Sequence, residues 1–135
     1  MYKKILIPIM LDEAHDPTPS FDVARKLADD DAKFMIIHVH ETIPSYAFAE
    51  VPAEYLAETR NNAKKILQKV AARFPEAESE LVVGHAGRGI LDYADAHDFD
   101  CIIIASHRPG LSDYFLGSTA GHVVRHAKCG VHVLR

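Results

Sequence analysis

The chain has 135 residues, of which 48% are hydrophobic and 25% are charged, and its formal net charge at pH 7 is −4. This length suits one domain with a sizeable core, and the composition excludes a disordered or low-complexity chain. The acidic balance and the scattered Lys and Arg residues exclude the basic surface typical of nucleic-acid-binding proteins, so we expect no nucleic-acid partner.

Short β-branched runs alternate with longer helical patterns, as in parallel βαβ units. The pattern predicts strands at residues 4–9, 34–40, 80–84, 101–105 and 131–134, and helices at residues 20–29, 53–74, 89–97 and 118–127. The first, fourth and fifth strands are the most apolar, so we expect them at the centre of the sheet, where both faces of a strand are covered. Ser20 follows Pro19 and is expected to cap the first helix. The sequence therefore predicts an α/β fold in one domain spanning residues 1–135.

The cysteines and the N-terminal apolar run indicate where the protein works. The run of six residues from Ile5 is interrupted by Pro8, and it predicts neither a signal peptide nor a membrane span. Cys101 and Cys129 form no disulfide framework, and both are expected to be reduced and buried. We therefore expect a cytoplasmic protein that does not associate with membranes.

Residues 41–52, with the sequence ETIPSYAFAEVP, fit neither the helical nor the strand period. A loop of this length exceeds what packing requires, and such loops often close over a site. The alternative is a surface crossover in which Tyr46 and Phe48 pack on the edge of the core. The sequence leaves both interpretations open.

The topology predicts where a ligand would lie. Open doubly wound sheets bind ligands outside the carboxyl ends of the strands, where the strand order reverses. If the first and fourth strands are neighbours at that reversal, the site follows Ile9 and Ala105. The helix that begins near Gly117 would direct the backbone N–H groups of Ser118 and Thr119 into the same crevice, and its positive dipole end suits a phosphate.

Several stretches, in this order and spacing, resemble the universal stress protein family over the whole length of the chain. They are MYKKILIPI, IIHVHE, VVGHAGRGILDYADAHDFDCIIIASH, Leu116-Gly117-Ser118 and VVRHAKCGVHVLR. The resemblance implies a Rossmann-like α/β fold of the adenine nucleotide alpha hydrolase type, with a five-stranded parallel sheet and helices on both faces. It also implies a bound adenine nucleotide, ATP or AMP, with or without Mg²⁺, and a homodimer that pairs through its last strand, residues 131–134.

The nucleotide motif of that family is a glycine, two residues, a second glycine, nine residues, and then glycine with serine or threonine. In this chain Ala105 stands at the first glycine, Arg108 lies near the second, eight residues follow, and Gly117-Ser118 completes the motif. Pro109 forces Arg108 into an extended conformation and denies it the left-handed one that glycine allows. We expect a rebuilt turn at Pro109 and Gly110, with Arg108 able to pair with phosphate.

Met10 stands where nucleotide-binding members of the family carry an aspartate that helps to hold the adenine or ribose. A thioether cannot replace those hydrogen bonds. Asp12 is close enough in sequence to reach back, but Asp12, Glu13 and Asp16 together would repel a triphosphate in the absence of a cation. We therefore expect weaker nucleotide binding than in members that keep every anchor. The residues expected to contact the nucleotide are Pro8, Ile9, Met10, Val39, Ala105, Ser106, His107, Arg108, Gly117, Ser118 and Thr119.

The nine histidines give no strong metal-site pattern. His122 and His126 are one helical turn apart, a spacing at which two imidazoles can share a metal, but no third ligand stands at a comparable offset. His38 and His40 alternate along one strand. Solvent-facing histidines are the simpler interpretation, and His107 is the one expected to donate to a phosphate.

No residue pattern indicates efficient catalysis. Ser106 and His107 are neighbours in sequence, which does not make a catalytic triad. The chain has neither a Walker lysine motif nor a G-x-G-x-x-G run. Ser118 is expected to contact phosphate or, more simply, to cap its helix. At most, slow ATPase activity is expected.

Two functions from different classes remain. In the first, the protein is a dimeric stress-response regulator that binds an adenine nucleotide. In the second, it is a nucleotide-free interaction module that binds a protein partner through its dimer surface, and side chains such as Met10 and Arg108 fill the crevice.

Overall fold

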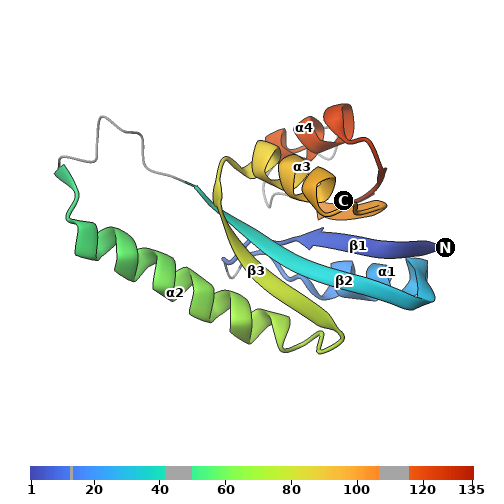
Figure 1. Ribbon diagram of the computed structural model, residues 1–135, viewed down its shortest axis with the longest axis horizontal. Coiled ribbons are helices and arrows are strands. Elements are labelled where there is room, and N and C mark those ends of the chain that lie inside the picture. The colour runs from blue at the N-terminus through green and yellow to red at the C-terminus, as the bar shows by residue number, and fades with distance from the viewer. Residues whose placement is uncertain (13, 42–49, 107–115) are drawn as a thin grey trace.

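Five parallel strands form a single sheet at the centre of the molecule (Figure 1). The computed structural model describes residues 1–12, 14–41, 50–106 and 116–135. The strands are β1 (Tyr2–Pro8), β2 (Ala28–Glu41), β3 (Ala77–Gly84), β4 (Cys101–Ala105) and β5 (Gly130–Leu134), and they lie in the order β3-β2-β1-β4-β5. The predicted α/β fold with a five-stranded parallel sheet is therefore confirmed.

Helices cover both faces of this sheet, as predicted. They are α1 (Thr18–Leu27) and α2 (Ala53–Ala71) on one face, and α3 (Ala86–Ala96) and α4 (Ser118–His126) on the other (Figure 1). Successive side chains of a strand point to opposite faces, so β1 contributes to both core layers. Ile5 and Ile7 pack in the layer with α1 and α2, and Leu6 packs in the layer with α3 and α4.

The strand order reverses at β1. This strand pairs with β2 on one side, where Ile5 lies opposite Phe34, and with β4 on the other, where Ile5 lies opposite Cys101. The chain moves outward from β1 to β2 and β3, and then crosses back to place β4 on the free side of β1. The first and fourth strands are therefore neighbours at the reversal, which is the arrangement that the predicted ligand site requires.

The predicted position of the fifth strand is wrong, because β5 lies at an edge of the sheet and β2 lies inside it. Every residue of β5 is half-buried. Val131 and Val133 are apolar because α3 and α4 cover one face of this edge strand, and not because it has two neighbours. In β2, Ile36 and Ile37 are fully buried on opposite faces. Apolar content thus reports coverage of the faces and does not identify the inner strands.

The free edge of β5 exposes the backbone of alternate residues. The Ser106 N–H donates to the Leu134 carbonyl at 2.8 Å, and the Gly130 N–H donates to the Asp100 carbonyl at 3.2 Å. In a parallel strand both backbone polar groups of one residue point to the same side. The backbone groups of Val131 and Val133 therefore point away from β4, where a second strand can pair with them.

The first helix differs from its prediction at both ends. It spans Thr18–Leu27, with Pro17 at the N-cap, and Ser20 is a buried residue inside the helix and not its cap. Arg25 and Lys26 occupy the last turn, where cations stabilise the helix dipole, whereas the acidic residues that follow would destabilise it. These acidic residues, Asp29, Asp30 and Asp31, instead lie at the start of β2, outside the core. The pairing register between β1 and β2 shifts there, between Tyr2 and Lys4 of β1.

The second helix extends past the sheet. Figure 1 shows its first half beyond the carboxyl ends of β2 and β3. Only Leu67 and Ala71 are buried among its residues, and Ile66, which helical spacing would place with Leu67 and Val70 on one apolar face, is 44% exposed. Phe74 lies beyond the helix end and packs against Phe21.

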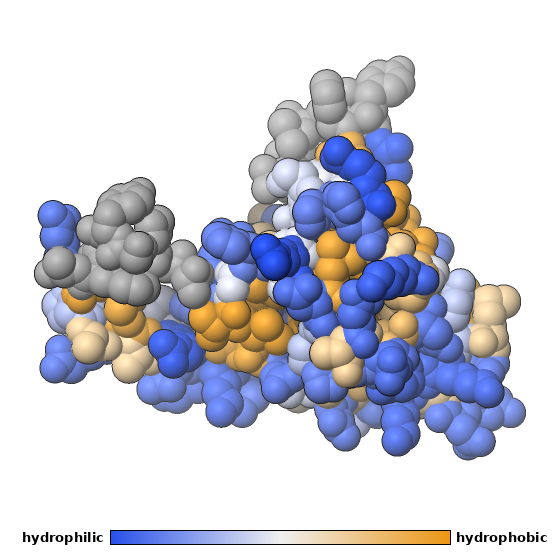
Figure 2. Space-filling model, turned by 45° about the horizontal axis from the view of Figure 1, so that its top comes forward, coloured by the Kyte–Doolittle hydropathy of each residue, from blue (hydrophilic) through white to orange (hydrophobic). Residues whose placement is uncertain are grey.

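On the face drawn in Figure 2, hydrophilic side chains predominate and hydrophobic ones gather in patches between them.

The other two helices lie close to their predictions. α3 begins three residues earlier than predicted, at Ala86, and α4 ends one residue earlier, at His126. Gly87 allows the two helices to approach, because a Cβ at this position would lie 2.8 Å from the His122 ring. None of the described helices combines the length and the apolar character that a membrane span requires.

The two cysteines differ in burial. Cys101 is buried and Cys129 is half-buried, so the expectation of burial is correct only for Cys101, and both thiols are free. Burial, with smaller contributions from Cys129 and Asp100, raises the pKa of the Cys101 thiol to about 12. Burial also raises the pKa of Cys129. A thiol reacts through its thiolate, so both should be poor nucleophiles near neutral pH.

We predict that Cys101 does not react with a disulfide reagent at pH 8 in the native protein and reacts fully in denaturant. The physical reason is that 1% of the residue is exposed and its thiolate is scarce at that pH. Absorbance of the released thiolate, with peptide mapping, measures the modification. Rapid modification of Cys101 in the folded protein would contradict this assignment.

The end of α3 carries a strained residue. Asp98 has a φ of 58°, in the left-handed region that glycine prefers. The Phe99 N–H donates to the Ala94 carbonyl at 3.0 Å, which is the bond that closes a helix end with glycine in this conformation. Asp98 also places a negative charge at the negative end of the helix dipole.

We therefore predict that Asp98→Gly raises the free energy of unfolding by about 0.5–1 kcal/mol. Urea denaturation followed by circular dichroism measures the change. Asp92→Gly, inside the same helix, is the matched control and should lower the stability by about 1 kcal/mol. Equal losses in both variants would show that the left-handed conformation of Asp98 carries no strain.

Candidate functional site

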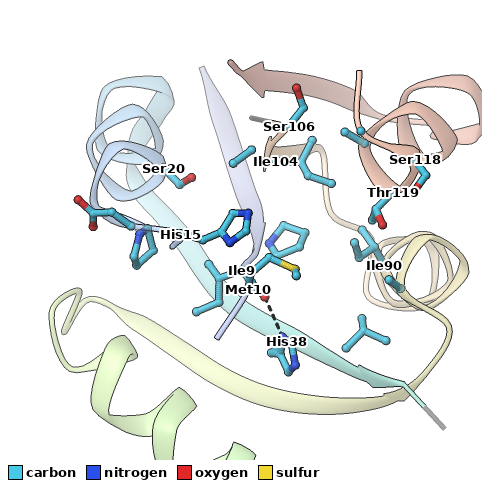
Figure 3. A pocket seen from close by; sticks show the side chains of 18 residues that line it. Ile9, Met10, His15, Ser20, His38, Ile90, Ile104, Ser106, Ser118 and Thr119 are labelled. Atoms are coloured by element: carbon cyan, nitrogen blue, oxygen red, sulfur yellow. Dashed lines mark hydrogen bonds between the residues drawn. The ribbon is translucent and has the colours of Figure 1, made fainter. Parts of the chain in front are cut away.

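A pocket opens at the carboxyl ends of β1 and β4 (Figure 3). It brings together nine of the eleven residues predicted from the sequence, which are Pro8, Ile9, Met10, Val39, Ala105, Ser106, Gly117, Ser118 and Thr119. The other two, His107 and Arg108, lie outside the described residues, as do the turn expected at Pro109 and Gly110, and Tyr46 and Phe48. The pocket therefore lies where the strand order reverses.

The pocket has further lining residues that the sequence analysis did not select. They are His15, Asp16, Pro17, Ser20, His38, Ala86, Ile90, Ile104 and Ala120. Ala86 and Ala120 stand in the first turns of α3 and α4, and parallel topology places these turns at the same sheet edge as Met10. That rule would have identified them. His15 and Asp16 follow β1 in an irregular segment, where no periodicity predicts the direction of a side chain.

Three helices begin at this pocket, and their positive dipole ends therefore converge on it. The first turns of α3 and α4 contain no acidic residue that would neutralise these ends, whereas at the start of α1 the Asp16 carboxylate accepts from the Thr18 N–H. In α4 the first intrahelical bond runs from the Gly121 N–H to the Gly117 carbonyl, at 2.7 Å. The N–H groups of Ser118, Thr119 and Ala120 have no acceptor within the helix, and such groups bind anions.

Gly117, and not Ser118, is the N-cap of α4, so the expectation that Ser118 caps this helix is wrong. Gly117 has φ −57° and ψ 153°, a conformation open to any residue. A Cβ at this position would lie 3.5 Å from the Ser106 carbonyl oxygen, an ordinary contact. The backbone thus tolerates a side chain at residue 117, and the absence of one leaves the end of the helix accessible.

Ser106 carries a polar group that the described residues leave unpaired. The residue is 8% exposed, and its Oγ has no hydrogen-bond partner among them. Its N–H is held by the Leu134 carbonyl, so the residue is fixed at the end of β4. An unpaired buried hydroxyl costs about 1–3 kcal/mol. A polar ligand in this pocket could recover part of that cost.

The walls of the pocket are mostly apolar. Ile9, Val39, Ile90 and Ile104 are buried core residues that also line it. Met10 is 51% exposed at the opening and adds a thioether, a weak acceptor. Figure 3 shows Ser118 and Thr119 across the pocket from Met10. The pocket thus combines an apolar region, which suits a flat ring, with backbone donors, which suit a phosphate.

The acidic residues near the pocket are paired. Asp12 accepts a hydrogen bond from His15 Nδ1 at 2.5 Å, and this bond is the main cause that lowers the pKa of the Asp12 carboxyl. Asp16 accepts one from the Thr18 N–H at 3.0 Å, which lowers its pKa, and Arg73 lies 3.9 Å away. The unshielded repulsion expected from Asp12 and Asp16 is therefore reduced. Glu13 lies outside the described residues.

The described part of the chain contains no group of three His, Cys, Asp or Glu residues that could hold a metal ion. The rings of His122 and His126 lie 4.6 Å apart on α4. His38 Nδ1 donates to the Ile9 carbonyl at 2.9 Å, drawn as a dashed line in Figure 3. This bond joins the carboxyl ends of β1 and β2 beside the pocket.

Comparisons with a family model, with known sequences and with solved structures all indicate the same protein family. The model of the universal stress protein family matches residues 1–135. Universal stress protein A homolog 2 from Coxiella burnetii is 34% identical, over 99% of this chain and 95% of its own length. The structure of the universal stress protein UspA from Lactobacillus plantarum superposes with a TM-score of 0.71 at 26% identity, covering 99% of this chain and 98% of the other.

Some structural neighbours contain adenine nucleotides. A family protein from Arabidopsis thaliana with AMP bound has a TM-score of 0.66 at 16% identity, and the match covers 98% of this chain and 90% of the other. A universal stress protein in complex with cAMP has a TM-score of 0.72 at 19% identity, and one from Archaeoglobus fulgidus in complex with dAMP has a TM-score of 0.61 at 20% identity. At these identities the likeness establishes the shared fold.

Proposed function

The chain belongs to the universal stress protein family, and from this premise we propose that it binds an adenine nucleotide, ATP or AMP, in the pocket between the ends of β1 and β4. The observation that carries the proposal is the set of backbone N–H groups at the start of α4 that have no acceptor within the helix and lie in one pocket with apolar walls. The nucleotides held by structural neighbours support it.

Each part of the pocket suits one part of the ligand. The phosphate would bind at Gly117, Ser118 and Thr119, where the helix dipole and the free N–H groups favour an anion. The base would lie against Ile9 and Val39, which are apolar. His107 and Arg108 would add phosphate contacts from the adjoining segment. A Mg²⁺ ion would enter with ATP, held chiefly by its phosphates.

We propose a regulatory role in the stress response and not efficient catalysis. Among the described pocket residues, no nucleophile is hydrogen-bonded to a base in the manner of a catalytic triad. Any turnover would be slow ATPase activity. The two free thiols suit the cytoplasm, where thiols stay reduced, and we propose that location.

The second candidate function is a nucleotide-free interaction module. Its supporting observation is the exposure of apolar side chains beside the pocket, with Met10 at 51% and Leu116 at 39%. Exposed apolar groups of this kind commonly bind protein partners. A thermal-shift titration separates the two functions. Millimolar Mg-ATP or AMP should raise the melting temperature only if the protein binds the nucleotide.

We predict that Gly117→Asp abolishes nucleotide binding and leaves the fold intact. The new carboxylate would lie at the phosphate position and repel it, while the ordinary 3.5 Å contact leaves room for the side chain. Asp is also a favourable N-cap, only slightly better than glycine, so the stability should stay equal or rise by about 0.3 kcal/mol. Isothermal titration calorimetry with AMP and ATP measures the binding.

Gly117→Asn is the matched control, since it has the same shape without the charge. It should retain more affinity than Gly117→Asp, and Gly117→Ala should retain most of it. Unchanged affinity in Gly117→Asp would show that the start of α4 does not hold the phosphate.

We also propose that the protein is a homodimer that pairs through the free edge of β5. Its apolar residues and unpaired backbone groups would otherwise stay at an exposed sheet edge. Val133→Pro should produce a monomer, because proline removes an N–H that faces the free edge and leaves the bonds to β4 in place. Light scattering at micromolar concentration measures the mass.

Val133→Ala keeps that N–H and should stay dimeric. A wild-type protein with the mass of a monomer would contradict the dimer. A dimer that survives Val133→Pro would place the interface elsewhere.

A further inference from the structure

Asp12 and His15 form a hydrogen-bonded pair at the wall of the pocket, between β1 and α1. His15 Nδ1 and Asp12 Oδ1 are 2.5 Å apart, and the His15 N–H also contacts the Asp12 carbonyl at 3.4 Å. The His15 side chain is 24% exposed and lines the pocket, whereas Asp12 is not among the lining residues. Figure 3 shows the His15 ring on the α1 side, beside Met10. Asp12 thus holds the His15 ring through its Nδ1 and does not itself line the pocket.

This contact determines which ring nitrogen carries the proton and which one keeps a lone pair. The lowered pKa of Asp12 keeps its carboxyl ionised near neutral pH, and an ionised carboxylate only accepts hydrogen bonds. His15 Nδ1 must therefore carry a proton. In the neutral ring Nε2 is then left with a lone pair, and it acts as an acceptor.

An acceptor at this place complements the rest of the pocket. The α4 side offers backbone N–H donors, and most of the walls are apolar. The Asp16 carboxylate accepts from the Thr18 N–H and keeps further lone pairs, and His38, whose Nδ1 donates to the Ile9 carbonyl, also keeps an acceptor at Nε2. Met10 offers only a thioether. Of these acceptors, Nε2 of His15 belongs to the ring that a carboxylate holds and that lies beside Met10 (Figure 3).

We propose that His15 Nε2 accepts a hydrogen bond from a sugar hydroxyl of the bound nucleotide, and that Asp12 is the positioning residue that fixes its tautomer. This inference rests on the proposed function and adds a ligand preference, for ribose over a sugar that lacks its hydroxyls. A phosphate monoester, mostly doubly ionised at pH 8, has no proton to offer a neutral imidazole. The hydroxyls and the amino group of adenine are the donors that remain.

Calorimetry at pH 8 with three ligands tests the assignment. The wild type should bind AMP about fivefold more tightly than 2′,3′-dideoxy-AMP, the effect of one hydrogen bond. His15→Ala should bind the two ligands equally within about twofold, for the same reason. Inosine monophosphate, which lacks the amino group, should respond to His15→Ala as AMP does. His126→Ala removes an exposed imidazole at the far end of α4 and should keep the wild-type preference.

A spectroscopic measurement tests the role of Asp12 without any nucleotide. Long-range ¹H–¹⁵N spectra of the wild type should show His15 with its proton on Nδ1. Asp12→Ala should move the proton toward Nε2, the form that free imidazole side chains favour, and should reduce the preference for AMP. Adding Asp12→Ala to His15→Ala should cause no further loss, because Asp12 acts through the ring.

The outcomes separate this inference from the proposed function. If AMP binds and His15→Ala keeps the ribose preference, the contact to the sugar is wrong and nucleotide binding stands. If the variant loses discrimination between AMP and inosine monophosphate instead, the ring contacts the base and the sugar assignment is wrong. If the wild type binds none of the three ligands, both proposals are overturned.

Discussion

The pairing of β1 with β4 is the contact on which the rest of the structure depends. It is short, with Ile5 opposite Cys101 and Leu6 opposite Ile102. All four side chains are almost completely buried, so this seam lies in the middle of both core layers. Because the strand order reverses here, the connections that leave β1 and β4 diverge to opposite faces of the sheet. The crevice between them is the pocket.

The sequence predicted the fold well because its information is periodic. Each predicted strand and helix exists, and most of the predicted ends lie within a few residues of the observed ones. Local periodicity does not determine the two features that differ from expectation. The position of β5 at an edge depends on how the chain crosses the sheet, and the exposure of Ile66 depends on how far α2 extends past it. Both are tertiary properties that a local pattern does not contain.

The candidate site was predictable where it follows the ends of strands and the starts of helices. Ala105, Ser106 and Gly117 line the pocket because regular elements carry them there. His15 and Asp16 escaped prediction because the direction of a side chain in an irregular segment depends on its local hydrogen bonds. In the sequence, only their spacing relates the histidines to one another, as for His122 and His126. In the structure the partner of each ring distinguishes them, as the Ile9 carbonyl does for His38 and a carboxylate does for His15.

The convergence of three helix starts on one pocket has a consequence for how an anion would arrive there. The chain as a whole carries a net charge of −4, which repels an anion at long range. The field of a helix end fades within about one turn, and salt screens it further. Attraction would therefore act only after the anion has entered the opening. Encounter would then be unassisted by electrostatic steering, and the local field would lengthen the residence time of the bound anion while leaving its rate of arrival almost unchanged.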